Sequence, residues 1–189
     1  MDINKLNDAF NNDYFIDLTL ILSDANQDIT IDLHKIILYS SCMYFEKLLT
    51  SCKEKHLNKI QIEVPNAFVC YDIIMSFYGQ ITNLGNLPQW YYLLEYIQCC
   101  DFLGLEKDIY KLKNLKVPVE GFDLLLQITE LFGYDYDTTK LIINNLPDDY
   151  NLSKLDKHLI KKIIKYHDPS GTQSSSAWGH TMIQLGFGN

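Results

Sequence analysis

The amino-acid sequence predicts an α+β fold, in which a small β-sheet flanked by helices is followed by a short all-helical extension. Three short runs of alternating apolar residues near the start of the chain predict strands. Apolar residues at helical spacing dominate the remainder. The chain has 189 residues, 47% of them hydrophobic and 21% charged, which is enough to bury a core in one or two compact units.

Each of the three runs places its apolar side chains on one face of a strand. They are Leu18, Leu20 and Leu22; Ile29, Ile31 and Leu33; and Ile60, Ile62 and Val64. The polar residues 23–28 suit a hairpin connection between the first two strands. A helix is expected between the second and third strands, because Phe45, Leu48 and Leu49 recur at helical spacing and Ser41 can cap its first turn.

Three further helices are expected after the third strand. The first begins after Asn66 and is broken at Gly79, and the second ends at Gly104 in a left-handed cap. Their apolar stripes are Phe68, Tyr71, Ile74, Met75 and Tyr78; Trp90, Leu93, Leu94 and Ile97; and, in the third helix, Leu105, Ile109 and Leu112. Such stripes are more typical of a core than of a cofactor site.

Composition and charge argue against several classes of protein. The 16 basic and 24 acidic residues give a net charge of -8, which repels a phosphate backbone, so no nucleic-acid partner is expected. The apolar stretches are too short to cross a membrane, and no signal-peptide pattern is present. We expect a soluble, intracellular protein of the cytoplasm or nucleus.

Neither a metal site nor a catalytic site is predicted. The five cysteines lack the paired spacing of disulfides or zinc ligands, and the histidines are scattered singly, so reduced thiols and no cofactor are expected. Phosphate-binding and nucleophile motifs are absent. The nearest constellation is Asp17 with His34 and Lys35, but no activated nucleophile accompanies it. We expect His34 to cap a helix or to pack beneath it, and we expect no enzyme.

Residues 17–20 followed by 33–45 resemble the signature of the BTB/POZ family, approximately D-V-x-L and then A-H-K-x-x-L-A-A-x-S-x-Y-F. Further ordered matches extend the resemblance over about residues 6 to 113. Three departures are Leu33 in place of Ala, Met43 where Pro is common, and one residue missing between Tyr78 and Gly79. The resemblance implies a BTB/POZ domain over residues 1–113, acting as a protein-interaction module.

The rest of the chain is similar, more weakly, to the BACK-type helical extension that follows many BTB domains. Over residues 117–166, three short helices are expected, with Ser153 and Asp156 able to cap the last. The apolar positions are Phe122, Leu125 and Leu126; Leu141 and Ile142; and Leu152, Leu155, Leu159 and Ile163. Residues 167–189 are expected to form a flexible or vector-derived tail. The composition resembles that of BTB proteins from giant DNA viruses.

Two sites for self-association are expected. Ile3, Leu6 and Phe10 form an apolar stripe at helical spacing ahead of the first strand, and such a stripe needs a partner. The resemblance implies that it packs across the two-fold axis of a homodimer. The alternative is that it folds back on its own domain. Asp17 and Lys35 match the charged pair that lines the dimer groove of transcription-factor BTB domains.

A second docking surface is implied at Cys52 and Glu54, which align with the hydrophobic-x-Glu element through which many BTB adaptors engage a cullin. Cysteine is a smaller anchor than Met or Leu. A solvated charged loop is the alternative. The resemblance therefore implies a substrate adaptor for a cullin-RING ubiquitin ligase of the host, with an unknown substrate protein. The alternative is a self-associating scaffold or transcriptional-regulator module without a ligase role.

Overall fold

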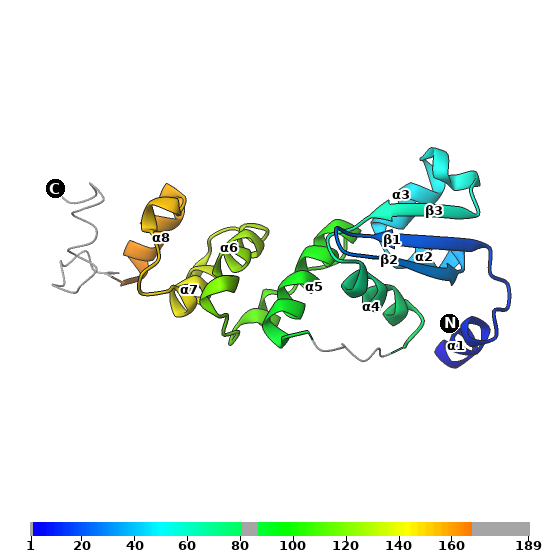
Figure 1. Ribbon diagram of the computed structural model, residues 1–189, viewed down its shortest axis with the longest axis horizontal. Helices are drawn as coiled ribbons and strands as arrows, with labels where there is room; N and C mark the ends of the chain where they lie inside the picture. The colour runs from blue at the N-terminus through cyan, green and yellow to red at the C-terminus, as the bar shows by residue number, and fades with distance from the viewer. Residues whose placement is uncertain (1, 81–86, 168–189) are drawn as a thin grey trace. The chain divides into compact units, whose positions relative to one another are not determined.

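The computed structural model describes residues 2–80 and 87–167, and the chain divides into two compact units (Figure 1). The first unit ends at Asp108 and the second begins at Ile109. The first contains the β-sheet and the second contains only helices among its described residues. The α+β fold that the sequence predicts is confirmed, and the structure is mostly helical.

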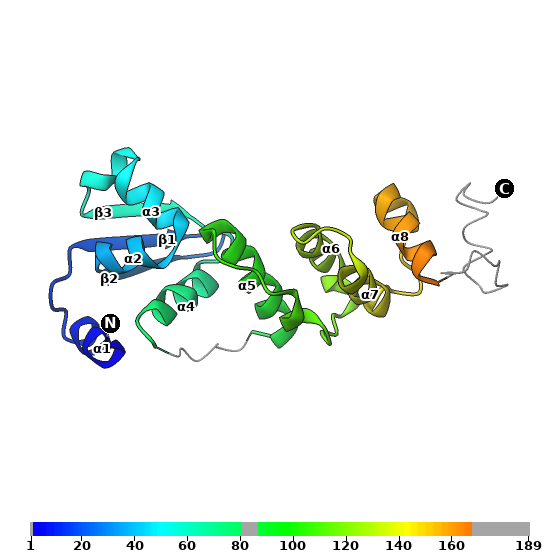
Figure 2. The same cartoon turned by 180° about the vertical axis from the view of Figure 1, so that it is seen from behind.

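The sheet has three strands, and β1 (Leu18–Ser23) lies between the other two. It pairs antiparallel with β2 (Asp28–Leu33) and parallel with β3 (Lys59–Glu63). The register brings the predicted inward-facing side chains together, for example Leu20 opposite Ile31 and Ile60. All three predicted strands are thus confirmed to within a residue of their ends. Figures 1 and 2 show the helices labelled α2 and α3 on one side of this sheet.

The helices of the first unit bury its core against the sheet. They are α1 (Ile3–Asn11), α2 (Lys35–Ser41), α3 (Met43–Thr50), α4 (Ala67–Phe77) and α5 (Gln89–Leu103), with the short 3-10 helix η1 (Lys53–His56). Phe45, Ile74 and Leu103 are fully buried at the centre. The core is therefore shared between sheet and helices, as the alternation of patterns predicted.

The structure corrects the predicted cap at Ser41. Ser41 is the last residue of α2, and its hydroxyl donates to the carbonyl of Ile37 at 2.7 Å. A serine with helical backbone reaches back one turn in this way, so it cannot cap the following helix. Cys42, with an extended backbone, separates α2 from α3 and occupies the N-cap position without a side-chain hydrogen bond.

The two predicted boundaries around α4 and α5 are confirmed. Asn66 caps α4, because its Oδ1 accepts the amide of Val69 at 3.1 Å. Gly104 ends α5 with φ +69°, and the amide of Leu105 donates to the carbonyl of Cys100. The α-helix predicted to follow is wrong, because only the 3-10 helix η2 (Ile109–Leu112) forms there.

Replacing Gly104 with alanine should destabilise the first unit by about 1 to 2 kcal/mol for the left-handed backbone, with a further cost from crowding. A Cβ there would lie 3.3 Å from the Cβ of Met43. Gly133→Ala is the matched control, since Gly133 also has positive φ but no atom within 4 Å of the added carbon. Urea denaturation should show the larger loss for Gly104→Ala, and equal losses would contradict the crowding.

The second unit contains the three helices predicted for it: α6 (Phe122–Glu130), α7 (Tyr136–Asn145) and α8 (Lys157–His167). Short 3-10 helices lie at Val119–Gly121 (η3) and Leu152–Lys154 (η4). The predicted capping role of Ser153 is wrong, because its hydroxyl donates to Asn151 while Asp156 alone accepts amides at the start of α8. The resemblance of the second unit to a BACK-type extension stays a prediction. Residues 168–189 of the predicted tail lie outside the described residues.

Candidate protein-interaction surfaces

The predicted apolar stripe lies on α1, which packs on its own domain. Leu6 is buried, and the ring of Phe10 lies 4.7 Å from that of Tyr78. Gln80 Nε2 donates to the side-chain oxygens of Asn7 and Asn11, each at 3.0 Å. This is the arrangement expected under the alternative to a dimer contact, although Ile3 remains 47% exposed. A dimer contact through the stripe stays a prediction.

A buried polar network joins the start of α2 to the end of α4. The amide of His34 donates to the Tyr78 hydroxyl at 3.0 Å, and ring atom Nδ1 lies 3.1 Å from the same oxygen. The other ring nitrogen, Nε2, lies 2.6 Å from the carbonyl oxygen of Tyr14. A carbonyl only accepts, so Nε2 carries a proton, and in the neutral ring Nδ1 then accepts from the Tyr78 hydroxyl. Burial raises the pKa of Tyr78 to about 12.

Asp17 and His34 do not form a catalytic pair. The Asp17 carboxylate accepts the backbone amide of Lys35 at 2.8 Å, so it caps α2 from a distant part of the sequence. Both ring nitrogens of His34 are taken by the contacts to Tyr14 and Tyr78. Two roles were expected for His34, capping α2 or packing beneath it. The structure shows the second, because His34 makes no side-chain cap.

The predicted groove residues Asp17 and Lys35 are neighbours, but Lys35 extends away from the carboxylate. Its Nζ donates to Asn58 Oδ1 at 3.2 Å, while its amide meets Asp17. Within residues 2–80 and 87–167 the two side chains form no ion pair. Whether they line a groove between two copies stays a prediction.

An apolar patch beside this pair was missed by the sequence reasoning. We call it the α2 surface: Tyr14, Phe15, Ile36 and Tyr39, with exposed fractions of 55%, 88%, 65% and 42%. The two hydrogen bonds described above, from His34 to Tyr14 and from Lys35 to Asp17, hold the linker next to the start of α2. Exposed apolar groups gathered in this way mark an interaction site more often than scattered ones. Ile36 and Tyr39 are three residues apart, which is the signal that could have revealed an outward stripe.

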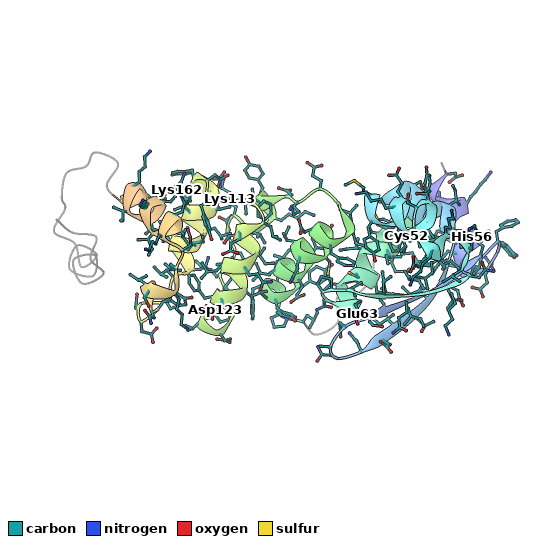
Figure 3. All side chains as sticks on the ribbon, turned by 90° about the horizontal axis from the view of Figure 1, so that it is seen from above. Cys52, His56, Glu63, Lys113, Asp123 and Lys162 are labelled. Carbon is teal, nitrogen blue, oxygen red and sulfur yellow. The ribbon has the colours of Figure 1, made fainter. Side chains whose placement is uncertain are left out.

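The predicted cullin-docking residues lie on η1, a 3-10 helix and not an irregular loop. Cys52 is exposed at its N-cap position and Glu54 is half-buried within it. Figure 3 labels Cys52 and His56, at the two ends of this turn. Burial, together with the nearby Cys52 and Glu54, raises the pKa of Tyr44. Tyr44 thus lies close to both predicted residues.

We call the patch around these residues the η1 surface: Tyr44, Cys52, Glu54 and Leu57. Leu57 is 48% exposed, and the Tyr44 ring packs on Phe102 at 4.8 Å between centroids. Sequence reasoning missed Tyr44 because it belongs to a different helix. The arrangement offers a carboxylate beside several apolar groups.

The part of the chain that the structure describes contains no group of three or more side chains suited to hold a metal ion. None of the described helices has the length and apolar character that a membrane span needs.

Comparison with known proteins places the sequence features in a family. The model of the BTB/POZ domain matches residues 6–117, more than half of the chain. The chain is 47% identical over 167 residues to a BTB/POZ domain-containing protein of Acanthamoeba polyphaga mimivirus, covering 88% of this chain and 22% of that protein. It is 46% identical over 164 residues to a BTB/POZ domain and WD-repeat protein of the same virus, covering 86% and 31%. The chain thus spans less than a third of these relatives.

Proposed function

Because the chain belongs to the BTB/POZ domain family and is therefore a protein-interaction module, we propose that it is a homodimerising adaptor for a cullin-RING ubiquitin ligase. The η1 surface is the observation that carries the ligase role. It combines a half-buried carboxylate, Glu54, with an exposed apolar group at Leu57 and the half-buried ring of Tyr44. The cullin of the host is the proposed partner.

The η1 surface suits a helical partner for a physical reason. The carboxylate of Glu54 fixes the register of the partner, while the apolar groups around it supply area that is removed from water. Cys52 contributes a small anchor at the centre, which predicts a weak contact. The ring of Tyr44 packs on the ring of Phe102, and this contact restrains Tyr44 within the patch.

The substrate would be recruited by a part of the protein beyond this module. Four of the matched relatives are described as BTB/POZ domain and WD-repeat proteins. A second domain of that kind would supply the contact to a substrate protein, and dimerisation would present two such domains to one ligase. We propose that the dimer forms through the α2 surface and includes α1.

Titration calorimetry against the amino-terminal domain of the host cullin tests the ligase role. Cys52→Met should tighten binding by about 1 kcal/mol through added buried methylenes. Glu54→Lys should weaken it without unfolding the domain. Glu63→Lys is the matched control, because Glu63 is an exposed carboxylate at the far end of β3 (Figure 3).

The scaffold function is the second candidate, and the small Cys52 anchor favours it. Under this alternative the protein self-associates without meeting a ligase. Neither the wild type nor the Cys52→Met variant would then give heat or a complex with the cullin. That result would leave η1 as a solvated turn and the homodimer as the functional unit.

A further inference from the structure

The helix α8 concentrates positive charge in a chain that is acidic as a whole. It carries four of the 16 basic residues and no acidic residue. Lys157, Lys161 and Lys165 are exposed, and their spacing of four residues places them on one face of the helix. The acidic excess lies elsewhere, because residues 1–108 contain 7 lysines and 15 acidic residues, whereas residues 109–167 contain 9 and 8.

This arrangement of charge opposes the stability of α8 itself. Lysines four residues apart on a helix repel one another, and a lysine in the first turn opposes the helix dipole. Lys157, Lys161 and Lys165 combine both features. None of the three forms an ion pair within the part of the chain that the structure describes. An anionic partner would remove the repulsion that the folded chain leaves in place.

Two tyrosine rings border the lysines of α8. The ring of Tyr136, on α7, lies 5.4 Å from that of Tyr166 between centroids, and Tyr136 is 65% exposed. Tyr166 follows Lys162 by four residues, so both lie on the same side of α8. Lys140 Nζ lies 5.9 Å from the centroid of the Tyr136 ring. An exposed aromatic ring therefore lies among lysines of two helices.

Two carboxylates near this row of side chains serve as helix caps. Asp135 accepts the amide of Thr138 at 2.9 Å, and Asp156 accepts the amide of His158 at 2.7 Å. Hydrogen bonds from Thr138 lower the pKa of Asp135, and the charge of Lys162 lowers it further. The exposed lysines on the outer face of α8 take no part in these contacts.

We propose that this face of the second unit binds single-stranded nucleic acid without sequence preference. We call it the α8 surface: Lys140, Lys161, Lys162, Lys165, Tyr136 and Tyr166. Lysines contact phosphates as point charges, and an exposed aromatic ring stacks on an unpaired base. Lysines four residues apart are about 6 Å apart along the helix axis, a spacing that suits neighbouring phosphates of one extended strand. This inference goes beyond the proposed adaptor function and does not depend on it.

Other anionic partners fit the α8 surface less well. An acidic protein would use the lysines but leave the exposed ring of Tyr136 without a role, and a duplex keeps its bases stacked within itself. A helix that binds a lipid surface inserts its apolar face, whereas Leu159, Ile160 and Ile163 of α8 are buried. The chain contains no arginine, the side chain that most often reads a base, so no sequence preference is expected.

Binding is expected in spite of the net charge of -8, because charges more than about 8 Å away are largely screened at physiological ionic strength. Fluorescence anisotropy measures it, with a labelled oligothymidine about 20 nucleotides long titrated with the full chain. The dissociation constant should be about 1 to 100 µM. Contacts from four lysines should weaken the affinity about 20-fold when the salt concentration is raised about threefold.

Replacing two lysines of α8 tests the charge. Lys161→Gln together with Lys165→Gln should weaken binding about tenfold and reduce the salt dependence by about half, because two of the four charges are removed. Lys47→Gln together with Lys59→Gln is the matched control, since both are exposed lysines of the first unit and the net charge is the same. Equal weakening in the two variants would overturn the α8 surface as the binding site.

Replacing Tyr136 tests the stacking. Tyr136→Ala should weaken binding of the single strand about tenfold and leave the affinity for a duplex of the same length unchanged. Tyr136→Phe keeps the ring and should bind like the wild type. Circular dichroism should show both variants folded, because the side chain is exposed. An unchanged affinity of Tyr136→Ala for the single strand would overturn the contact to an unpaired base.

Competition identifies the class of partner. A polyglutamate peptide with the same number of charges should displace the oligothymidine poorly. Displacement at equal concentration, together with no effect of Tyr136→Ala, would overturn the proposal in favour of an acidic protein partner. No binding of the oligothymidine at protein concentrations up to about 100 µM would also overturn it and leave the lysines of α8 as a solvated face.

Discussion

Replacing Ile36 and Tyr39 together with aspartate should convert the proposed homodimer into a monomer while the first unit stays folded. Both side chains are exposed on α2 in the single chain, so neither contributes to the core. In the dimer they would become two buried carboxylates without partners, at a cost of several kcal/mol, and the dissociation constant should rise by roughly 100-fold or more. Light scattering across a range of concentrations measures the change.

The matched control for this variant is Val119→Asp. Val119 is 66% exposed and belongs to the second unit, so it is not one of the residues of the α2 surface. It should leave the mass of the dimer unchanged. An unaltered dimer in the Ile36 and Tyr39 variant, with circular dichroism like that of the wild type, would exclude the α2 surface as the contact.

Aspartate at Leu6 and Phe10 is a poorer test of the same dimer. Leu6 is buried within its own domain and Phe10 packs on Tyr78, so these substitutions damage the chain in either oligomeric state. Loss of the dimer would then follow from loss of the fold. The exposed residues of α2 separate the two effects.

Replacing Tyr78 with alanine should reduce the free energy of unfolding by about 3 to 5 kcal/mol, the cost of removing a large buried aromatic ring. Tyr78 is fully buried, contacts Phe10 and accepts the amide of His34. Tyr78→Phe keeps the ring and removes the hydroxyl, so it should cost about 1 to 3 kcal/mol by leaving buried polar groups of His34 without a partner. Urea denaturation of both variants measures the two contributions.

The control for these substitutions is Phe15→Ala, which truncates an aromatic residue that is 88% exposed. It should change stability by no more than about 0.5 kcal/mol. If Tyr78→Phe proved as stable as the wild type, the hydrogen bonds to His34 would contribute nothing, and the network would not explain how α2 is held to α4.

The α2 surface and the η1 surface both lie in the first unit. Most of the region matched by the BTB/POZ domain model, residues 6–117, lies in the same unit. The α2 surface and the η1 surface are built from different helices, so self-association and cullin docking need not compete for the same residues. Lys53 and Lys55 are exposed on η1. The surface therefore offers positive charges to acidic side chains of a partner, in addition to its apolar groups. Glu54 carries the single negative charge of η1, and the Glu54→Lys variant reverses that charge.

Features that depend on local periodicity and backbone conformation could be predicted from the order of the amino acids. Alternation at Leu18, Leu20 and Leu22 requires a strand with one buried face, and the structure has it. Asn66 and Gly104 mark helix ends because an amide side chain can accept an orphan N–H and glycine adopts positive φ. The ordered motifs likewise identified the family.

Contacts between residues distant in the chain became known from the folded structure. The apolar stripe that includes Leu6 predicts that α1 packs on another apolar surface. It does not predict whether that surface belongs to the same domain or to a second copy, because both offer similar apolar groups. Tyr78 looked like an ordinary core position, yet its hydroxyl meets His34 across 44 residues of sequence. The cap at Asp17 and the position of Tyr44 beside Glu54 are of the same kind. Such contacts depend on how the helices pack on the sheet, which periodicity along one segment does not encode.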